Sequence, residues 1–188
     1  MRSDPRQSSL QGNRPLLWAL LCFAGGIGAA VAALMSSADA MFLSRLGTRH
    51  LGTGFALSSG VSIALLWWLG NRADRGDRAV LLWRACRVAL ATLLLVLLVD
   101  RVFPRVSALC LLVSSKQIGG ALELLLWLVI ADRFTAREIR RVVPWVIVAN
   151  GAGAALGAAS VGPLANAFGT TGPLWATAGL LLIVGVYV

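Results

Sequence analysis

Apolar runs of about 20 residues dominate this sequence, and short segments rich in arginine separate them. A helix needs roughly 20 apolar residues to cross the hydrocarbon core of a bilayer, which is about 30 Å thick. Strands of a membrane β-barrel instead alternate apolar and polar residues, and these runs do not alternate. With 58% hydrophobic and 13% charged residues, the chain is also too apolar for an ordinary soluble domain. We therefore predict an all-α, polytopic membrane helical bundle.

The runs predict six transmembrane helices. They cover residues 16–43, 51–69, 79–99, 106–130, 142–165 and 173–188. The first run is too long for the core of a cleavable signal peptide, so we count it as a span. Residues 1–15 are expected to form an amino-terminal tail, and residues 16–188 a six-helix transmembrane bundle. The last run is short and lacks a basic flank, so we expect the bundle to be truncated within helix six.

The arginines predict how the bundle is oriented. Those on one side are Arg2, Arg6, Arg14, Arg72, Arg75, Arg78, Arg84, Arg87, Arg133, Arg137, Arg140 and Arg141, and those on the other are Arg45, Arg49, Arg101 and Arg105. Basic residues remain in the cytoplasm, so this excess predicts a cytoplasmic amino terminus. Many Arg with a single Lys hint at a GC-rich bacterial source. We expect a multi-pass protein of the bacterial inner (cytoplasmic) membrane.

Composition also weighs against several classes of function. The formal net charge is +9, but the arginines flank apolar runs, and no basic helix with interleaved aromatic residues points to nucleic acid. Cys22, Cys86 and Cys110 are scattered, and His50 is the only histidine, so neither metal-ligand spacing nor a catalytic constellation is present. We predict no enzyme activity, no metal, no cofactor and no nucleic-acid partner.

The loop GNRADRGDR, at residues 70–78, resembles the cytoplasmic loop signature of the major facilitator superfamily. The match consists of Gly70, Asp74, Arg75 and Arg78. The pattern departs from the family at Asp77 and Ala79, which stand where a glycine and a basic residue are usual. The resemblance implies a cytoplasmic gate, in which the acid and the arginines form contacts that break when two halves of a carrier rock. A solvated loop that only sets topology is the alternative.

Two further segments, FLSRLGTRHLG at 42–52 and DRFTAREIRRVVPWVIVANGAGAALGA at 132–158, are similar to the ATP/ADP antiporter (nucleotide transporter) branch of this superfamily and its bacterial relatives. The shared run is Phe134, Thr135, Glu138 and Arg141, before a glycine-rich fifth span. The resemblance implies about twelve helices, with one six-helix half here and a second half downstream or in another subunit. It makes a small anionic solute the expected cargo, without assigning nucleotide specificity.

Small residues in the fifth run predict close helix packing. Gly153 and Gly157 form a GxxxG pair, and Gly162 continues the same face. The first run has a comparable face that includes Gly25 and Gly28. We assign these glycines to helix contacts rather than to a hinge.

The fourth run contains two charges at membrane depth, Lys116 and Glu123. Seven residues place them about 20° apart around a helix and roughly 10.5 Å apart along it, on a stripe that we expect to face the bundle interior. Charge near the bilayer centre needs water or a partner. Lys116 and Glu123 could line an aqueous path with Gln117 and Asp39, or Glu123 could form a structural ion pair with Lys116 or an arginine. Asp39 could equally be solvated or paired locally.

Together these features predict a secondary transporter, or its amino-terminal half, that moves a small anionic solute by alternating access. The lipid bilayer and a second six-helix half are its expected partners. The alternative is a non-transporting scaffold or sensor module with the same fold.

Overall fold

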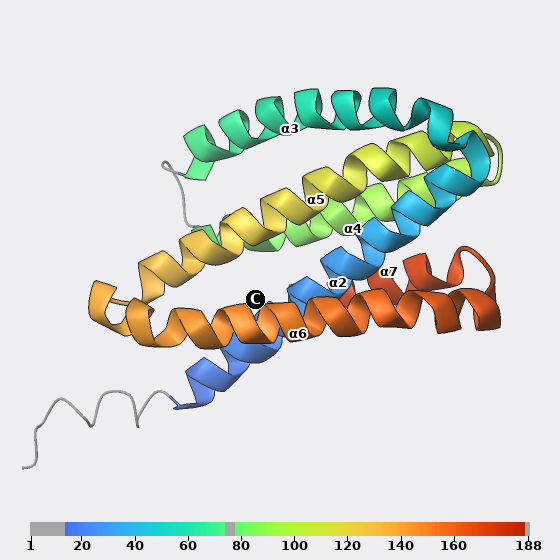
Figure 1. The fold of residues 1–188 in the computed structure, drawn as a ribbon. Helices are drawn as coiled ribbons and strands as arrows, with labels where there is room; N and C mark the ends of the chain where they lie inside the picture. Colours follow the sequence, from blue (N-terminus) through green and yellow to red (C-terminus); the bar gives the residue numbers. More distant parts are fainter. Residues whose placement is uncertain (1–13, 74–77, 187–188) are drawn as a thin grey trace, which may run out of the picture.

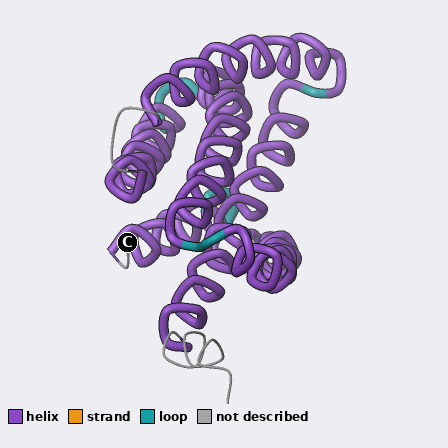
Figure 2. Tube along the Cα trace, turned by 90° about the vertical axis from the view of Figure 1, so that its left-hand side faces the viewer, coloured by secondary structure: helices purple, strands orange, loops and turns teal. Residues whose placement is uncertain are grey.

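The computed structural model describes residues 14–73 and 78–186, and these residues form helices joined by short loops, with no strand among them (Figure 1). The long helices are α2 (Arg14–Leu46), α3 (Leu51–Ala73), α4 (Arg78–Asp100), α5 (Pro104–Arg133), α6 (Ala136–Phe168) and α7 (Gly172–Val186). A single 3₁₀ turn, η1 (Thr48–His50), joins α2 to α3. Figure 2 shows the loops gathered at the two ends of the bundle.

The prediction of an all-α chain with six helices is confirmed for the described residues. Five of these helices, α2 to α6, are long and apolar enough to cross a membrane. The sixth, α7, has 15 residues and is shorter than the roughly 20 that a span requires. The predicted boundaries of the first five runs fall within the observed helices, because polar residues at the helix ends continue the helix beyond the apolar run. The sixth run was predicted to reach residue 188, and residues 187–188 lie outside the described part of the chain.

The helices form two layers. In Figure 1, α3, α5, α2 and α6 follow one another down the view, and α4 and α7 lie behind them. Within the front layer, α5 packs against α3 and α2, and α2 packs most extensively against α6. Behind it, α4 contacts α5 and α7, and α7 also contacts α2. The helix α2 is therefore the centre of the bundle.

Glycines allow α2 and α6 to approach closely. A Cβ atom at Gly153 would overlap the backbone oxygen of Gly25, and one at Gly157 would overlap the backbone oxygen of Ala29. On the other helix, a Cβ at Gly28 would overlap Asn150. The faces of small residues predicted in the first and fifth runs thus pack against each other, as parts of α2 and α6. Gly162 takes no part, because nothing lies within 4 Å of where its Cβ would be.

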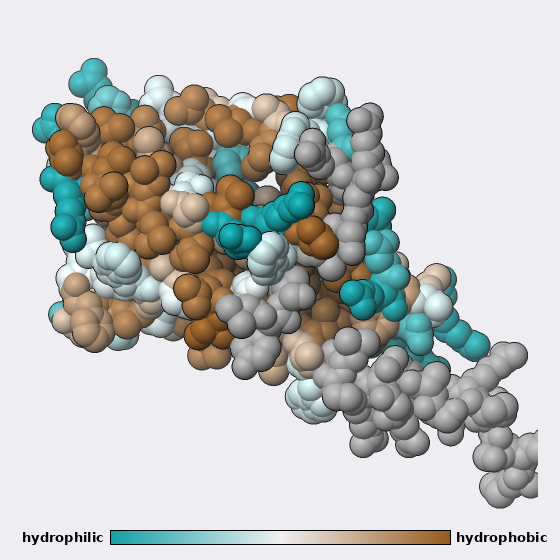
Figure 3. All heavy atoms as spheres, turned by 180° about the vertical axis from the view of Figure 1, so that it is seen from behind, coloured by the Kyte–Doolittle hydropathy of each residue, from teal (hydrophilic) through white to brown (hydrophobic). Residues whose placement is uncertain are grey.

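The core lies between the two layers, and the exterior is apolar. Large buried side chains such as Ile27, Leu34, Leu93 and Leu125 come from α2, α4 and α5. Large apolar side chains also remain on the outside, and Figure 3 shows a large apolar area on the back of the molecule, interrupted by hydrophilic side chains. An apolar exterior suits lipid, in which exposed hydrophobic side chains carry no cost.

The two ends of the bundle differ in charge. The end where α3 and α5 finish and α4 and α6 begin carries Arg78, Arg133 and Arg137, and we call it the arginine-rich end. The opposite end contains the α2–α3, α4–α5 and α6–α7 connections.

Candidate functional site

Lys116 of α5 forms an ion pair with Asp39 of α2, which lies 77 residues earlier in the chain. Its Nζ atom is 3.2 Å from both carboxylate oxygens and donates a hydrogen bond to Oδ2. The other oxygen, Oδ1, is buried and accepts no hydrogen bond. The pair is not sealed, because 24% of the Lys116 side chain and 42% of the Asp39 side chain are accessible.

Residues of α3 contact both Lys116 and the next residue of α5, Gln117. The Gln117 amide donates hydrogen bonds of 2.9 Å to the Ser58 backbone oxygen and to the Ser62 hydroxyl. The Phe55 ring has its centroid 5.8 Å from the Lys116 ammonium, within reach of a cation–π attraction. Consecutive residues of α5 therefore contact different helices, with Lys116 directed to α2 and Gln117 directed to α3.

The ion pair lies far from both ends of α5. Lys116 comes 12 residues after Pro104 and 17 before Arg133, which corresponds to about 18 Å and 26 Å along the helix. Such a position is in the hydrocarbon region of a helix that spans a membrane, where an unpaired charge is expensive. Asp39 lowers that cost by neutralising the ammonium.

The side of α5 that carries Lys116 and Glu123 was predicted to face the bundle interior, but only part of it does. Glu123 lies on the outside of the six-helix unit. Ser115 and Gly119 are buried, whereas Glu123 is exposed and has no ion-pair or hydrogen-bond partner in the described part of the chain. The physical reason is that α2 covers only one edge of the stripe. A Cβ at Gly119 would overlap Met35 of α2, but one at Gly120 would meet nothing within 4 Å.

The uncovered edge is a distinct side of the bundle. Helix α5 packs against α2, α3 and α4, with only a small contact to α6. Between Ser107 and Ile130, Cys110 and Glu123 are the two exposed residues of α5. Glu123 lies two turns from Lys116 on nearly the same side of the helix, because seven residues complete almost two turns. The candidate site therefore consists of the open ion pair and the carboxylate of Glu123.

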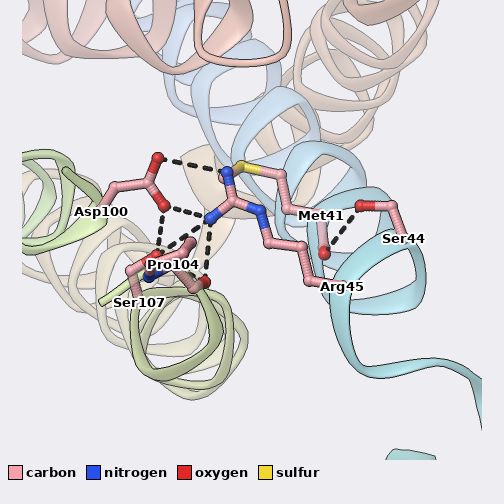
Figure 4. Close-up of polar contacts among 6 residues, drawn as sticks. All are labelled: Met41, Ser44, Arg45, Asp100, Pro104 and Ser107. Carbon is pink, nitrogen blue, oxygen red and sulfur yellow. Dashed lines mark hydrogen bonds and ion pairs between the residues drawn. The ribbon is translucent and has the colours of Figure 1, made fainter. Parts of the chain in front are cut away.

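A second polar cluster joins three helices at the opposite end of the bundle (Figure 4). The Arg45 guanidinium forms an ion pair with Asp100, the last residue of α4, and donates to the Pro104 backbone oxygen at 2.9 Å. The Ser107 hydroxyl donates to the same carboxylate. Arg45 is thus paired with Asp100 rather than with Asp39, which lies nearly two turns further into α2. The sequence analysis missed this cluster, although an acid that ends an apolar run was a visible signal.

The predicted cytoplasmic gate is described only in part. Asp74 and Arg75 lie outside the described residues. Gly70 lies in α3 with open space around it. Arg78 begins α4 and donates a hydrogen bond of 2.6 Å to Asp132, near the end of α5. Arg78 therefore joins two helices of the same unit at the arginine-rich end.

The Phe134-to-Arg141 run starts a helix. The backbone N–H and the hydroxyl of Thr135 both donate to Oε2 of Glu138, at 2.9 Å and 2.8 Å. This is a capping box, in which a Thr and a Glu three residues later satisfy donors at a helix start. The T-x-x-E spacing alone could have predicted this structural role.

The described residues contain no group of three His, Cys, Asp or Glu side chains that could hold a metal ion. Comparisons of the chain with protein-family models, with curated proteins and with solved structures find no match.

Proposed function

We propose that this chain is one six-helix half of a secondary carrier of the major facilitator type, which moves a small anionic solute by alternating access. One observation carries the proposal. The Lys116–Asp39 ion pair lies near the middle of α5 and about two turns inside the end of α2, both membrane-length helices, and it is partly accessible on a side of α5 that these six helices leave uncovered.

Charge in this position needs a wet or protein-covered environment. Lipid on that side of α5 would leave the exposed Glu123 in hydrocarbon, at a cost of at least about 2.5 kcal/mol if it stays charged. A second six-helix unit facing α5 would remove that cost by enclosing a water-filled passage. The proposed second half explains why Glu123 lies exposed at membrane depth on the open side.

The ion pair supplies the chemistry for binding an anion. Lys116 is the only lysine in the sequence, and its ammonium donates to a single carboxylate in this structure. An anionic group of the solute would compete with Asp39 for that ammonium, so binding would exchange one ion pair for another. Asp39 keeps the site neutral when no solute is bound, and Glu123 repels anions that have not reached Lys116.

The rival is a scaffold or sensor module in which the same pair only stabilises the fold. The satisfied Lys116–Asp39 contact is compatible with that role, because neither charge needs a ligand. Two results would favour the carrier over the scaffold: water in contact with residue 123, and loss of transport when Lys116 is replaced.

The first experiment measures water at Glu123. In a chain whose native cysteines are replaced by alanine, Glu123→Cys should react rapidly in intact membranes with an anionic methanethiosulfonate that does not cross lipid. Leu182→Cys is the control, because Leu182 is 53% exposed on the back-layer helix α7. The control should react slowly, since a thiol in hydrocarbon does not ionise. Equal rates at the two positions would contradict a wet passage.

The second experiment measures transport by the complete carrier in proteoliposomes. A panel of anionic metabolites is screened for counterflow, and the active solute is retested with Lys116→Ala. We expect uptake to be abolished while membrane insertion stays intact. Unchanged uptake would overturn the role of Lys116, and the absence of counterflow with any anion would favour the scaffold.

A further inference from the structure

A groove of about 680 Å³ lies between α3, α4 and α5, away from the Lys116–Asp39 pair. It exists because α3 and α4 both pack against α5 but have no extensive contact with each other. Its walls come from α3 and α4, and side chains such as Val113, Ile118 and Ala121 of α5 form its floor. Nearly all of the lining is apolar.

The medium around the helices determines what fills such a groove. In a membrane, a space between apolar helices that opens to the outside is filled by lipid chains, because leaving it empty forfeits dispersion contacts. The polar side chains of α5 that line the groove already donate hydrogen bonds, Gln117 to Ser58 and Ser62 and Ser114 to the Leu111 backbone oxygen, so no polar ligand is needed there. An acyl chain is the chemistry that fits the lining.

One charged residue, Arg84, lines the groove. It is six residues into α4, about 9 Å from the arginine-rich end, and its side chain leans toward that end as helical side chains do. Trp68 of α3 lines the groove at a similar level, five residues before the end of its helix. Tryptophan favours the headgroup region of a membrane, and a guanidinium binds phosphate through two parallel hydrogen bonds.

We infer that this groove binds an anionic phospholipid, with an acyl chain along α5 and the phosphate at Arg84. The assignment is independent of the proposed transport function, because Lys116, Asp39 and Glu123 do not line the groove. It makes α3, the helix with fewest neighbours, depend on a bound lipid for part of its packing.

Native mass spectrometry of the full chain in a mild detergent tests the headgroup. Phosphatidylglycerol should remain bound at lower concentration than phosphatidylcholine with the same chains. Arg84→Gln should weaken phosphatidylglycerol binding about fivefold, the effect expected for one basic residue at an anionic surface. Arg87→Gln is the matched control, since Arg87 lies one turn further along α4 with its guanidinium 4.4 Å from the Trp83 ring and does not line the groove. Equal losses for the two variants would overturn the site.

A second arm tests the acyl chain. Ala121→Phe fills the floor and should weaken binding of both lipids, whereas free glycerol phosphate should displace neither. If Ala121→Phe does not fold, Val88→Trp narrows the groove from its rim, where Val88 is 64% exposed. Unchanged lipid binding in a folded groove-filling variant, or displacement by free glycerol phosphate, would overturn the proposal.

Discussion

Lys116 places a positive charge midway along α5, and Asp39 supplies the opposite charge from another helix. The two residues are 77 positions apart, so the pair forms only when α2 crosses α5 at this level. Removing either partner leaves the other charge uncompensated at membrane depth. The pair therefore links the folding of two helices to the chemistry proposed for the site.

This coupling predicts a non-additive effect on stability. Lys116→Met and Asp39→Asn should each lower the free energy of unfolding by about 1–3 kcal/mol, because each leaves a partly buried charge without its partner. The double variant should lose less than the sum of the two. Thermal unfolding of the purified protein in detergent micelles gives the three values.

Glu123→Gln is the control for that cycle. Glu123 is exposed and contacts no charged partner in the described chain, so its replacement should change stability by no more than about 0.5 kcal/mol. Additive losses at Lys116 and Asp39 would mean that the ion pair contributes no coupling energy.

The sequence could predict that Lys116 matters but not which residue neutralises it. A charge inside an apolar run can be recognised from the sequence as energetically costly in a membrane, because the run itself shows that the charge lies at membrane depth. Its partner depends on how α2 and α5 cross, and Glu123 on the same helix was the nearer acid along the chain. The structure instead pairs Lys116 with Asp39 of α2, while Arg45, a local candidate partner for Asp39, pairs with Asp100.

At the scale of elements, the contact between α2 and α6 depends on glycine at matched positions. The GxxxG spacing returns Gly153 and Gly157 to one side of α6, and both lie directly against the α2 backbone. Close backbone contact of this kind replaces the hydrophobic effect, which is absent between helices in lipid. Sequence spacing identified this face. That Gly162 makes no such contact could not be predicted from spacing, because it depends on the path of α2 relative to α6.

Adding one methyl group should therefore separate the two helices. A Cβ at Gly157 would meet backbone atoms of Ala29 that cannot rotate away, so Gly157→Ala should lower the midpoint of thermal unfolding in micelles. Gly151→Ala is the matched control on the same helix, since nothing lies within 4 Å of its Cβ position. The control should be neutral or stabilising by up to about 1 kcal/mol, because alanine favours a helix over glycine. An equal decrease for both variants would show that packing against α2 is not the cause.

At the scale of the whole molecule, the bundle has a large apolar area on its back and an open side that carries the exposed Glu123. The six helices were predictable because hydropathy along the sequence identifies the apolar runs without tertiary information. Their division into two layers was not, since every long helix carries apolar residues on most of its sides and hydropathy does not choose neighbours. Small residues and a few polar contacts, such as the Arg45 cluster, make that choice.

The charge difference between the two ends predicts how the whole bundle is oriented in the membrane, and this prediction is open to direct test. Alkaline phosphatase is active only outside the cytoplasm, so a fusion after Phe103, at the opposite end, should be active. A fusion after Arg141, at the arginine-rich end, should be inactive, because Arg137, Arg140 and Arg141 are predicted to keep that segment in the cytoplasm. Changing these three arginines to glutamine should raise the activity of the second fusion, while Arg101→Gln, which removes a charge from the opposite end, should not. Activities in the reverse order would invert the orientation and place the open end of the phospholipid groove at Arg84 in the other leaflet.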